Sequence, residues 1–595
     1  MPKRPRPELA PLPLLGEQRG VWFNAWPLLI ILVASLPALL MSIGQRDVTR
    51  VMENVSIGSS QETWHKVVGV RGEPGDASAL ILPEWNGKPR IAKPPMLVWV
   101  NMGAAELTGH DPETTSADRF ILICRLVAVA FGLLAIASTY GIGLLVGDRK
   151  LAVFAAAIFA TMWCIVRASR TASYDGHLLG YATFALCASL WALAPFRDDP
   201  AKLGRQLLGF AAAALATAAA MLTKGPLALV IVLLPLLAMA AVMGKRWKTA
   251  ALGMVAIAAV SVAAFAWWYF AVEQLVPELR ASLAREYAAQ RDEAQPVWYY
   301  VLVLVMVVPW SPWLVAGLLH PFVNTGGRDR RVRLVPYAWF AALLLFFSIP
   351  MAKQQRYILP LIPAAALLCA TVIRDQLHMA KAGKPDPGAW ILQRPIGGVA
   401  VVGAVAFPAL LALQPWLMDK GWIDDLNLAT LSAPIAIVLG LLLLALAIPA
   451  EHYLRTHRLL RGVLFLAAWM SIITAVAGHA YAVRSGADDP TRDNAKQLLN
   501  LAAGRPLVYV RPEVATQPVI DDEEPLLIHL QRAIPTYDAE AFAQAFPVDA
   551  PWAKRPIVIT EPTDGPTHLA LDALGYAPAF TFLGDKETPR AVYAP

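Results

Sequence analysis

Long apolar runs separated by short polar segments repeat along most of the chain. Most runs have roughly the 17–25 residues that a helix needs to cross the hydrocarbon core of a membrane. We expect about thirteen spanning helices, at residues 26–44, 119–146, 151–167, 177–195, 206–222, 226–243, 249–272, 297–318, 335–350, 357–373, 396–414, 432–450 and 462–483. The pattern therefore predicts an α-helical polytopic membrane protein.

Composition points the same way. Hydrophobic residues make up 57% of the 595 residues, charged residues only 16%, and the mean hydropathy is +0.49, whereas soluble domains carry roughly 25% charged residues. The net charge of +7 comes without basic runs interleaved with stacking aromatics, so we expect no nucleic-acid partner. The four cysteines lie in predicted spans and indicate neither a disulfide framework nor a metal site.

The distribution of Lys and Arg predicts the orientation. Cationic residues concentrate in one alternating set of loops, for example Arg149-Lys150, Lys245-Arg246 and Arg328–Arg333. The positive-inside rule places this set, and with it the N-terminus, in the cytoplasm. An odd number of spans then puts the C-terminal region outside the cytoplasmic membrane.

Three regions follow from this pattern. We expect a cytoplasmic tail over residues 1–25, a transmembrane domain over 26–487 and an extracytoplasmic domain over 488–595. The transmembrane domain includes a long outer loop at 45–118. The last region alternates short β-type runs with helical stretches, which is typical of a small α/β domain. Its expected strands are Pro506–Val510, Pro556–Thr560 and Phe580–Leu583.

Candidate chemistry begins in the outer loop. Val48, Val51 and Val55 follow helical spacing, so we expect an amphipathic helix lying on the membrane, with Asp47 and Arg50 on its polar face. A carboxylate beside an arginine stays ionised and suits a general base that activates a hydroxyl. The alternative is an ordinary solvated helix face.

Lys93 precedes Pro94-Pro95 in the same loop. An ammonium group on a segment stiffened by two prolines can act as a point charge for a phosphate. The alternative is a lysine that extends its ammonium to the membrane interface.

Two further outer turns carry isolated charges. Arg170 and Asp175 lie between the third and fourth predicted spans, and Asp175 could pair with Asp47 or fix a basic group. Lys224 precedes Gly225-Pro226 in a tight reversal that does not itself require a lysine. The ammonium group of Lys224 could bind an anion. For both turns, the alternative is that the charges form ion pairs at helix ends without a functional role.

The last outer loops add cations and acids. Lys353, Arg356 and Tyr357 share a short hairpin that runs against the positive-inside trend, which favours an anionic partner. Glu286 and Glu293 precede the eighth predicted span and are candidate metal ligands, although a single glutamate indicates little.

These motifs together resemble the membrane-embedded C-type (GT-C) glycosyltransferases, in particular the bacterial branch of aminoarabinose transferases and relatives of the protein O-mannosyltransferases. The similarity covers about residues 25–375. The matching segments, in family order, are Asn86–Pro95, Asp175, Leu222–Pro226, Gln295–Tyr300 with Pro309–Ser311, and Ser348–Pro360.

The resemblance implies transfer of a sugar from a polyprenyl phosphate, such as undecaprenyl phosphate, to a lipid A-like or protein acceptor outside the cytoplasmic membrane. It implies that Asp47 is the base, and Asp175, which stands in a matching segment, is the second candidate catalytic residue. The residues implied to bind the donor phosphate or line its cavity are Arg50, Lys93, Lys224, Lys353, Arg356 and Tyr357.

Two departures from the family pattern concern the metal and the sugar. Val48 follows Asp47 where the family has a glutamate, and Ala92 stands where it has a glutamate before Lys-Pro-Pro. Because the later loop also lacks the family's histidine, we expect no required cofactor. A divalent metal is the alternative, and the sugar is left open.

We therefore expect a single inverting displacement at the sugar's anomeric carbon, in which cations stabilise the departing phosphate. The alternative from another class is a carrier or flippase that binds the polyprenyl-phosphate sugar without catalysis. Such a carrier would share the cations but would not need Asp47.

Overall fold

The structure is a computed structural model of the chain. It describes residues 21–46, 48, 51–70, 74–195, 201–244, 246–277, 279–281, 294–323, 327–381, 387–424, 426, 428–456, 458–487, 490–511, 525–547, 551, 554–562, 566–583 and 589–595.

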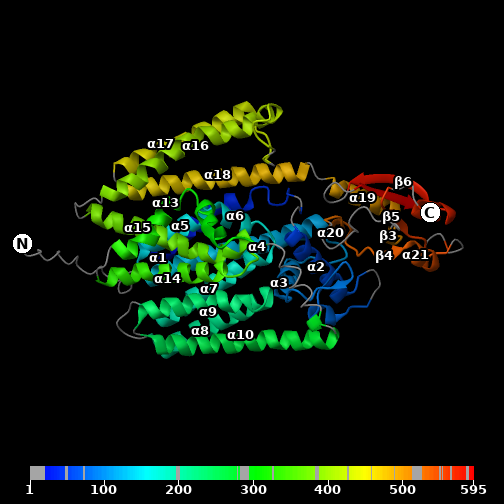
Figure 1. Cartoon of the computed structure of the whole chain (residues 1–595), viewed down its shortest axis with the longest axis horizontal. Helices are drawn as coiled ribbons and strands as arrows, with labels where there is room; N and C mark the ends of the chain where they lie inside the picture. The colour runs from blue at the N-terminus through cyan, green and yellow to red at the C-terminus, as the bar shows by residue number, and fades with distance from the viewer. Residues whose placement is uncertain are drawn as a thin grey trace, which may run out of the picture.

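Long apolar helices packed side by side make up most of the molecule (Figure 1). Within the described residues, nine helices are long and apolar enough to cross a membrane, or up to eleven if each of two bent pairs is one span. The polytopic helical fold is thus confirmed, while the number of about thirteen spans stays a prediction. The helices of this bundle are α1 (Val21–Leu40), α4 (Ala117–Val146), α5 (Arg149–Thr161), α6 (Trp163–Ser169), α7 (Tyr174–Leu193), α8 (Leu203–Lys224), α9 (Leu227–Met243), α10 (Trp247–Leu275), α13 (Ser311–Val323), α14 (Gly327–Ser348), α15 (Ile362–Lys381), α16 (Pro387–Asp419), α17 (Ala433–Arg455) and α18 (Leu459–Ala487).

Two of the predicted spans are bent. Helices α5 and α6 meet at 69°, and the segment formed by η3 (Val297–Leu302) and α12 (Val303–Met306) meets α13 at 120°. Pro309 lies at the second bend, where its ring and missing N–H oppose a continuous helix. The α5–α6 bend directs the chain into the turn that carries Arg170 and Asp175.

The outer loop forms a compact layer at one end of the bundle. It contains α2 (Val51–Val68), η1 (Ala77–Leu80), the hairpin strands β1 (Glu84–Trp85) and β2 (Lys88–Pro89), and α3 (Met96–Leu107). Helix α2 is not the predicted amphipathic surface helix, because residues 53–61 are all buried. It packs against α3, α4, η1, β1 and a C-terminal helix, and these contacts cover its polar faces as well.

The C-terminal region is a small α/β module, as predicted for the fold. Its five-stranded sheet has the order β4-β3-β5-β7-β6, in which β3 runs parallel to both β4 and β5, and β7 is antiparallel to both of its neighbours. The strands are β3 (Leu507–Arg511), β4 (Thr536–Asp538), β5 (Ile557–Thr560), β6 (Ala577–Leu583) and β7 (Pro589–Ala594), and the helices are α19 (Thr491–Ala502), α20 (Leu526–Leu530), α21 (Ala539–Ala545) and α22 (Pro566–Ala573).

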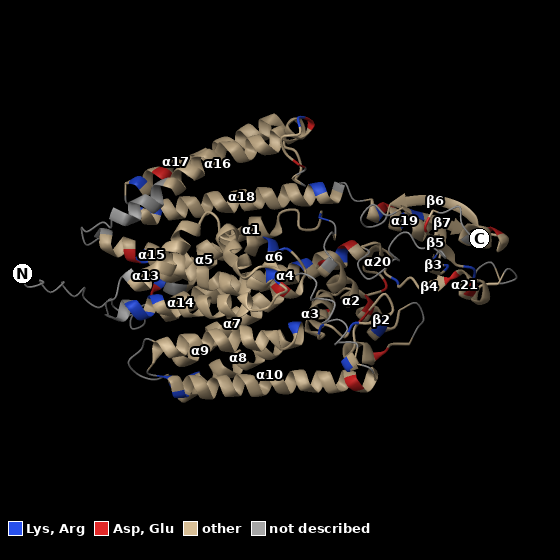
Figure 2. Ribbon diagram, viewed as in Figure 1, with Lys and Arg blue, Asp and Glu red and all other residues tan. Residues whose placement is uncertain are grey.

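The C-terminal module lies against the outer loop rather than against the middle of the bundle (Figure 1). Helix α20 contacts both α2 and α4. Trp64 of α2, Phe120 of α4 and Leu527 of α20 belong to one buried apolar cluster. Charged residues are sparse along the bundle and gather at its ends, in the loop and in the module (Figure 2).

Candidate active site

A carboxylate and two cations meet where the bundle faces the outer loop. Asp175 lies in the first turn of α7, and Lys224 is the last residue of its neighbour α8. Lys224 Nζ forms an ion pair with Asp175 Oδ1, and Arg356 Nε lies 3.8 Å from Asp175 Oδ2. The three side chains are only 11%, 10% and 34% exposed, in that order. Three segments far apart in the sequence thus converge at one place.

Tyr357 completes this cluster. The Lys224 Nζ atom lies 5.0 Å from the centre of the Tyr357 ring, and Arg356 Cζ lies 5.9 Å from it. Both cations are within the range of a cation–π interaction. We call Asp175, Lys224, Arg356 and Tyr357 the acid–cation cluster.

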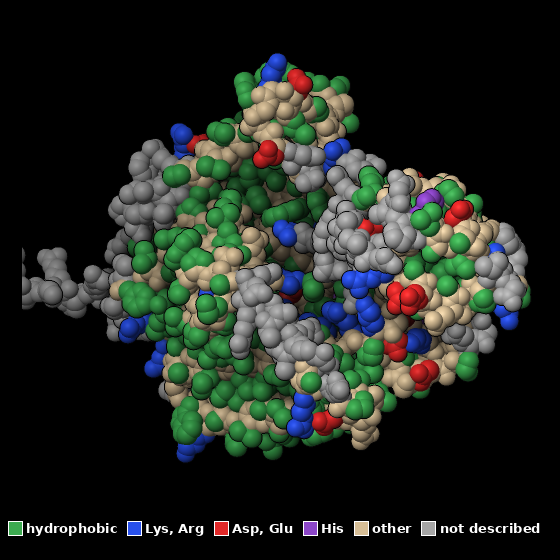
Figure 3. Space-filling view, turned by 45° about the vertical axis from the view of Figure 1, so that its right-hand side comes forward, with side chains coloured by type: hydrophobic (Ala, Val, Ile, Leu, Met, Phe, Trp, Pro, Cys, Tyr) green, Lys and Arg blue, Asp and Glu red, His purple; other side chains and the backbone are tan. Residues whose placement is uncertain are grey.

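The acid–cation cluster has more positive than negative charge. One carboxylate faces two cationic groups, which favours an anionic ligand. Arg356 Nε is buried and meets no hydrogen-bond acceptor within the part of the chain that the structure describes, although Asp175 is its ion-pair partner. Since buried donors are normally satisfied, a ligand oxygen would suit this position. Figure 3 shows Lys and Arg side chains inside the hollow between the bundle and the C-terminal module.

Lys93 approaches the same place from the outer loop. Its side chain is partly buried, and Pro94 and Pro95 behind it are buried. Ile91 and Met96, which flank this segment, pack in one apolar cluster with Leu222 near the end of α8. Helix α3, which begins at Met96, also packs against α8. The Lys93 segment therefore lies beside the helix end that carries Lys224.

Arg90 is a cation that we did not identify from the sequence. Its guanidinium lies close enough to the hydroxyl of Tyr174, the residue before Asp175, to interact with it electrostatically. The available signal was its place in the same proline-rich segment as Lys93. A third loop cation is thus connected to the start of α7.

Lys353 has a contact that holds two segments together. Its ammonium group donates a hydrogen bond to the Gln295 carbonyl at 3.0 Å, and the side chain is buried. The Gln295 N–H in turn donates to the Met351 carbonyl at 2.9 Å. The structure therefore connects Lys353 to the segment before η3, and its predicted contact with a donor stays a prediction.

Arg170 is likewise held by backbone carbonyls. Its guanidinium donates to the carbonyls of Ala38 at 2.9 Å, Met41 at 2.7 Å and Gly478 at 3.4 Å. These bonds join the turn after α6 to the end of α1 and to the interior of α18. Arg170 therefore connects three helical segments, and this structural role explains why an arginine is buried here.

A second ionic cluster, which the sequence did not reveal, lies under the beginning of α2. Glu53 is completely buried and pairs with Arg46 and with Arg125, whose Nε lies 3.0 Å from Glu53 Oε1. The Ala172 N–H donates to the same oxygen at 3.1 Å. Burial alone would raise the pKa of the Glu53 carboxyl, but Arg125, Arg46 and the Ala172 amide together hold it below its usual value.

This ionic cluster connects the two segments that carry the predicted acids. Arg125 also donates to the carbonyl of Ile43 at 2.9 Å and to that of Arg46. The bonds of Glu53 therefore join the chain before Asp47 to Ala172, which precedes Asp175. A buried carboxylate with several such partners holds its neighbours in a defined arrangement.

Four predicted site residues, Asp47, Arg50, Glu286 and Glu293, lie outside the described residues. Among the described residues, no group of three or more His, Cys, Asp or Glu side chains could hold a metal ion. The donor set of these described residues does not fit a metal centre.

The fold is shared with the C-type membrane glycosyltransferases. It matches ArnT from Cupriavidus metallidurans bound to undecaprenyl phosphate, with a TM-score of 0.65 and 18% sequence identity over 96% of this chain and 98% of that one. ArnT from the same organism in the apo state matches with a TM-score of 0.63 and 19% identity. No protein-family model matches the chain.

Sequence comparison points to the same group of enzymes. The chain is 26% identical over 340 residues to an undecaprenyl phosphate-alpha-4-amino-4-deoxy-L-arabinose arabinosyl transferase of Proteus mirabilis, covering 56% of this chain and 58% of that protein. A transferase with the same substrate name from Sodalis glossinidius is 26% identical over 381 residues, covering 61% and 62%. The predicted resemblance is confirmed, and the matches span about 60% of the length of these relatives.

Proposed function

We propose that this protein transfers a sugar from a polyprenyl-phosphate carrier to a lipid or protein acceptor at the outer side of the cytoplasmic membrane. The convergence of Lys224 and Arg356 on Asp175 is the observation that carries the proposal. Curated relatives whose names specify undecaprenyl phosphate and an aminoarabinose transfer support the class of donor.

The cations would act on the carrier phosphate. Cleavage of the bond between the anomeric carbon and the phosphate oxygen leaves the electron pair on that oxygen, so the phosphate gains negative charge in the transition state. Lys224, Arg356 and Lys93 would stabilise this charge, and Arg50 is proposed to assist them. The low exposure of Lys224 strengthens its electrostatic effect relative to that in water.

The acids would have separate roles. Asp47 is proposed to accept the proton of the acceptor hydroxyl while the acceptor oxygen bonds to the anomeric carbon, which inverts that carbon. Asp175 would hold Lys224 and Arg356 in position, since it faces both of them. From the sequence we expected Asp175 either to pair with Asp47 or to fix a basic group, and this proposal assigns it the second role.

The proposed topology places the acid–cation cluster and residues 488–595 outside the cytoplasmic membrane and the N-terminus inside. The concentration of Lys and Arg in the opposite loops supports this orientation. Cysteines introduced near Lys93 and Lys353 should both react with a reagent that cannot cross the membrane. Labelling of the two positions from opposite compartments would contradict the topology and the site together.

No metal takes part in the proposed reaction, because the cations on the protein supply the charge stabilisation. We expect transfer to continue after treatment with a chelator of divalent ions. A loss that is restored by adding one specific divalent ion would show that a metal is required.

The main experiment uses the purified protein in detergent or vesicles with undecaprenyl-phosphate-linked sugars and candidate lipid and peptide acceptors. Mass spectrometry would follow formation of undecaprenyl phosphate together with the glycosylated acceptor. We expect the wild type to form both products, and Asp47→Asn to bind the carrier but form neither. Movement of the donor across vesicles with no transfer, unchanged in Asp47→Asn, would instead support the carrier or flippase.

A further inference from the structure

The C-terminal module holds one turn of the outer loop. Asn86 and Gly87 form the turn between β1 and β2, with φ of +54° and +69°, a backbone conformation that Asn-Gly pairs favour. The Asn86 side-chain oxygen accepts a hydrogen bond from the Ile534 N–H of the module at 2.9 Å. On the other side, Glu62 of α2 accepts the N–H groups of Asn86 at 2.7 Å and Gly87 at 3.0 Å. The turn is thus held between α2 and the module.

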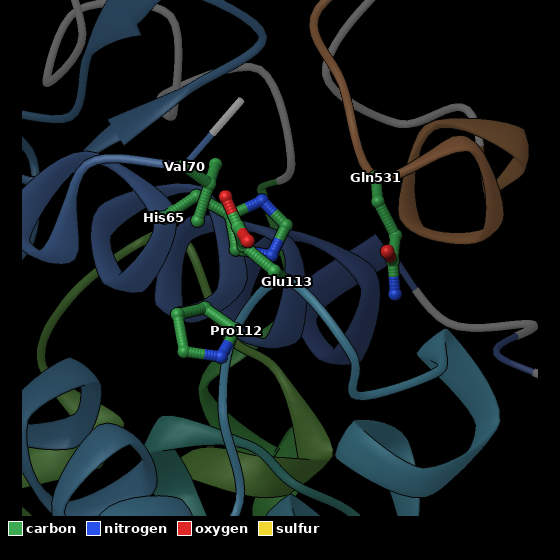
Figure 4. A pocket seen from close by; sticks show the side chains of 5 residues that line it. All are labelled: His65, Val70, Pro112, Glu113 and Gln531. Atoms are coloured by element: carbon green, nitrogen blue, oxygen red, sulfur yellow. The ribbon is translucent and has the colours of Figure 1, made fainter. Parts of the chain in front are cut away.

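The seam around this turn combines the buried apolar cluster that contains Trp85 and Ile534 with separate polar contacts. The Gln531 side chain donates to the Thr115 carbonyl at 3.0 Å, and Arg492 lies 3.2 Å from the Asp118 carboxylate. A cavity of about 290 Å³ lies at the same seam. Figure 4 shows Gln531 of the module across from the lining residues of the outer loop. The residues that line the cavity are His65, Val70, Pro112, Glu113 and Gln531. Apolar packing holds the module against the loop, and the hydrogen bonds across the seam add a direction that apolar contacts lack, so each contributes to the position of the loop.

The hairpin leads from this turn to the candidate active site. Trp85 is buried against α2 at Gly58, which has no side chain to obstruct the indole ring. Beyond β2, the Arg90 N–H donates to the Pro83 carbonyl at 2.7 Å and closes the base of the hairpin. The Arg90 guanidinium then interacts electrostatically with Tyr174, next to Asp175.

The remainder of the segment is equally restricted. Pro89, Pro94 and Pro95 limit the backbone between the hairpin and α3. Ile91 packs with Leu222 below Lys224. A displacement of the turn would therefore be transmitted along a short and stiff segment to Lys93.

We propose that Asn86 is a positioning residue through which the C-terminal module holds the Lys93 segment in place for the carrier phosphate. This inference rests on the proposed transfer reaction and assigns a role to residues 488–595. Asn86 touches neither donor nor acceptor in this proposal. It acts through the hairpin, Arg90 and Lys93.

Two substitutions at one position test the proposal. Asn86→Gly keeps the left-handed backbone without strain and removes the side-chain acceptor. Asn86→Asp keeps an acceptor oxygen for the Ile534 N–H and also tolerates this conformation. In Asn86→Gly, we expect kcat/KM for the donor to fall about three- to tenfold, as loss of one hydrogen bond implies. We expect an unchanged KM for the acceptor, and near wild-type values for Asn86→Asp.

Hydrogen–deuterium exchange gives a readout that does not depend on activity. In the donor-free protein, Asn86→Gly should increase exchange in residues 88–93, whereas Asn86→Asp should resemble the wild type. Unchanged exchange and kinetics in Asn86→Gly would overturn the inference, as would equal loss in Asn86→Asp. If the wild type transfers no sugar, the proposed function fails, and the exchange result alone then shows whether Asn86 holds the segment.

Discussion

Arg125 Nε lies 3.0 Å from Glu53 Oε1, and both side chains are fully shielded from solvent. The two residues are 72 positions apart, on α4 and α2. Arg46 and the Ala172 amide bond to the same carboxylate. One buried carboxylate thereby joins α2 and α4 to Arg46, which precedes Asp47 in the sequence, and to Ala172, which precedes Asp175.

Replacing Glu53 with glutamine should destabilise the protein by about 3–5 kcal/mol, because two buried arginines lose their counter-charge. The isosteric change avoids a cavity, so the charge is the main variable. Thermal or denaturant unfolding of the detergent-solubilised protein would measure the effect. Glu84→Gln is the matched control, since Glu84 pairs with a partly exposed Lys66 and its loss should cost at most about 1 kcal/mol. Similar losses for both variants would contradict the importance of burial here.

The same carboxylate predicts how stability depends on pH. The pKa of Glu53 is held below its usual value of 4.5 in the folded protein. Its contribution to stability is therefore fully present above that value and is lost as the pH falls through the lower, folded-state pKa. We expect the wild type to lose more stability than Glu53→Gln when the pH is lowered from 7 into this acidic range. Parallel loss in both proteins would show that other groups control acid unfolding.

Gly58 gives a prediction about packing. A side-chain carbon at this position would overlap the Trp85 ring, which lies against α2. We expect Gly58→Ala to destabilise the outer loop by about 1–3 kcal/mol through overpacking. Gly103, in the middle of α3, has open space around it, so Gly103→Ala should be neutral or stabilising by about 0.5–1 kcal/mol. Limited proteolysis within residues 45–118 would compare them, and equal sensitivity would count against the close Gly58–Trp85 contact.

The pattern of the sequence predicted the helical bundle and identified part of the candidate site. Apolar length identifies spans without tertiary information, and isolated charges in short turns identified Asp175, Lys224 and Arg356, which the fold then brings together. Consecutive spanning helices alternate in direction, so every second turn lies on the same side of the membrane and can contact the other turns on that side. Turn chemistry and topology were therefore enough for these residues.

The buried ionic cluster could not be predicted in this way. Arg125 is one charge inside a long apolar run, and its partner Glu53 lies in a helix whose surroundings decide its burial. The spacing of apolar residues in α2 predicted an amphipathic surface helix. Local spacing does not show which elements pack on the remaining faces of a helix, and here α4 and α20 cover them. Such long-range pairing depends on the complete tertiary fold.

The geometry of the acid–cation cluster predicts non-additive effects on catalysis. Removing the Lys224 charge with Lys224→Gln should lower kcat/KM about a hundredfold if it stabilises the departing phosphate. Asp175→Asn should lower kcat/KM about tenfold, because the cation loses the carboxylate that holds it. If Asp175 acts through Lys224, the double variant should be no worse than Lys224→Gln alone.

Arg356 supplies the check on this argument, since it also faces Asp175, at 3.8 Å. If Asp175 positions both cations, adding Asp175→Asn to Lys224→Gln should cause a further, smaller loss of kcat/KM, because Arg356 also loses the carboxylate that positions it. That residual effect should disappear when Arg356→Gln is added. Kinetics of all combinations with one undecaprenyl-phosphate-linked donor would separate these contributions. Fully multiplicative losses would mean that Asp175 acts independently of both cations, and the carboxylate would then have to act on the substrate itself.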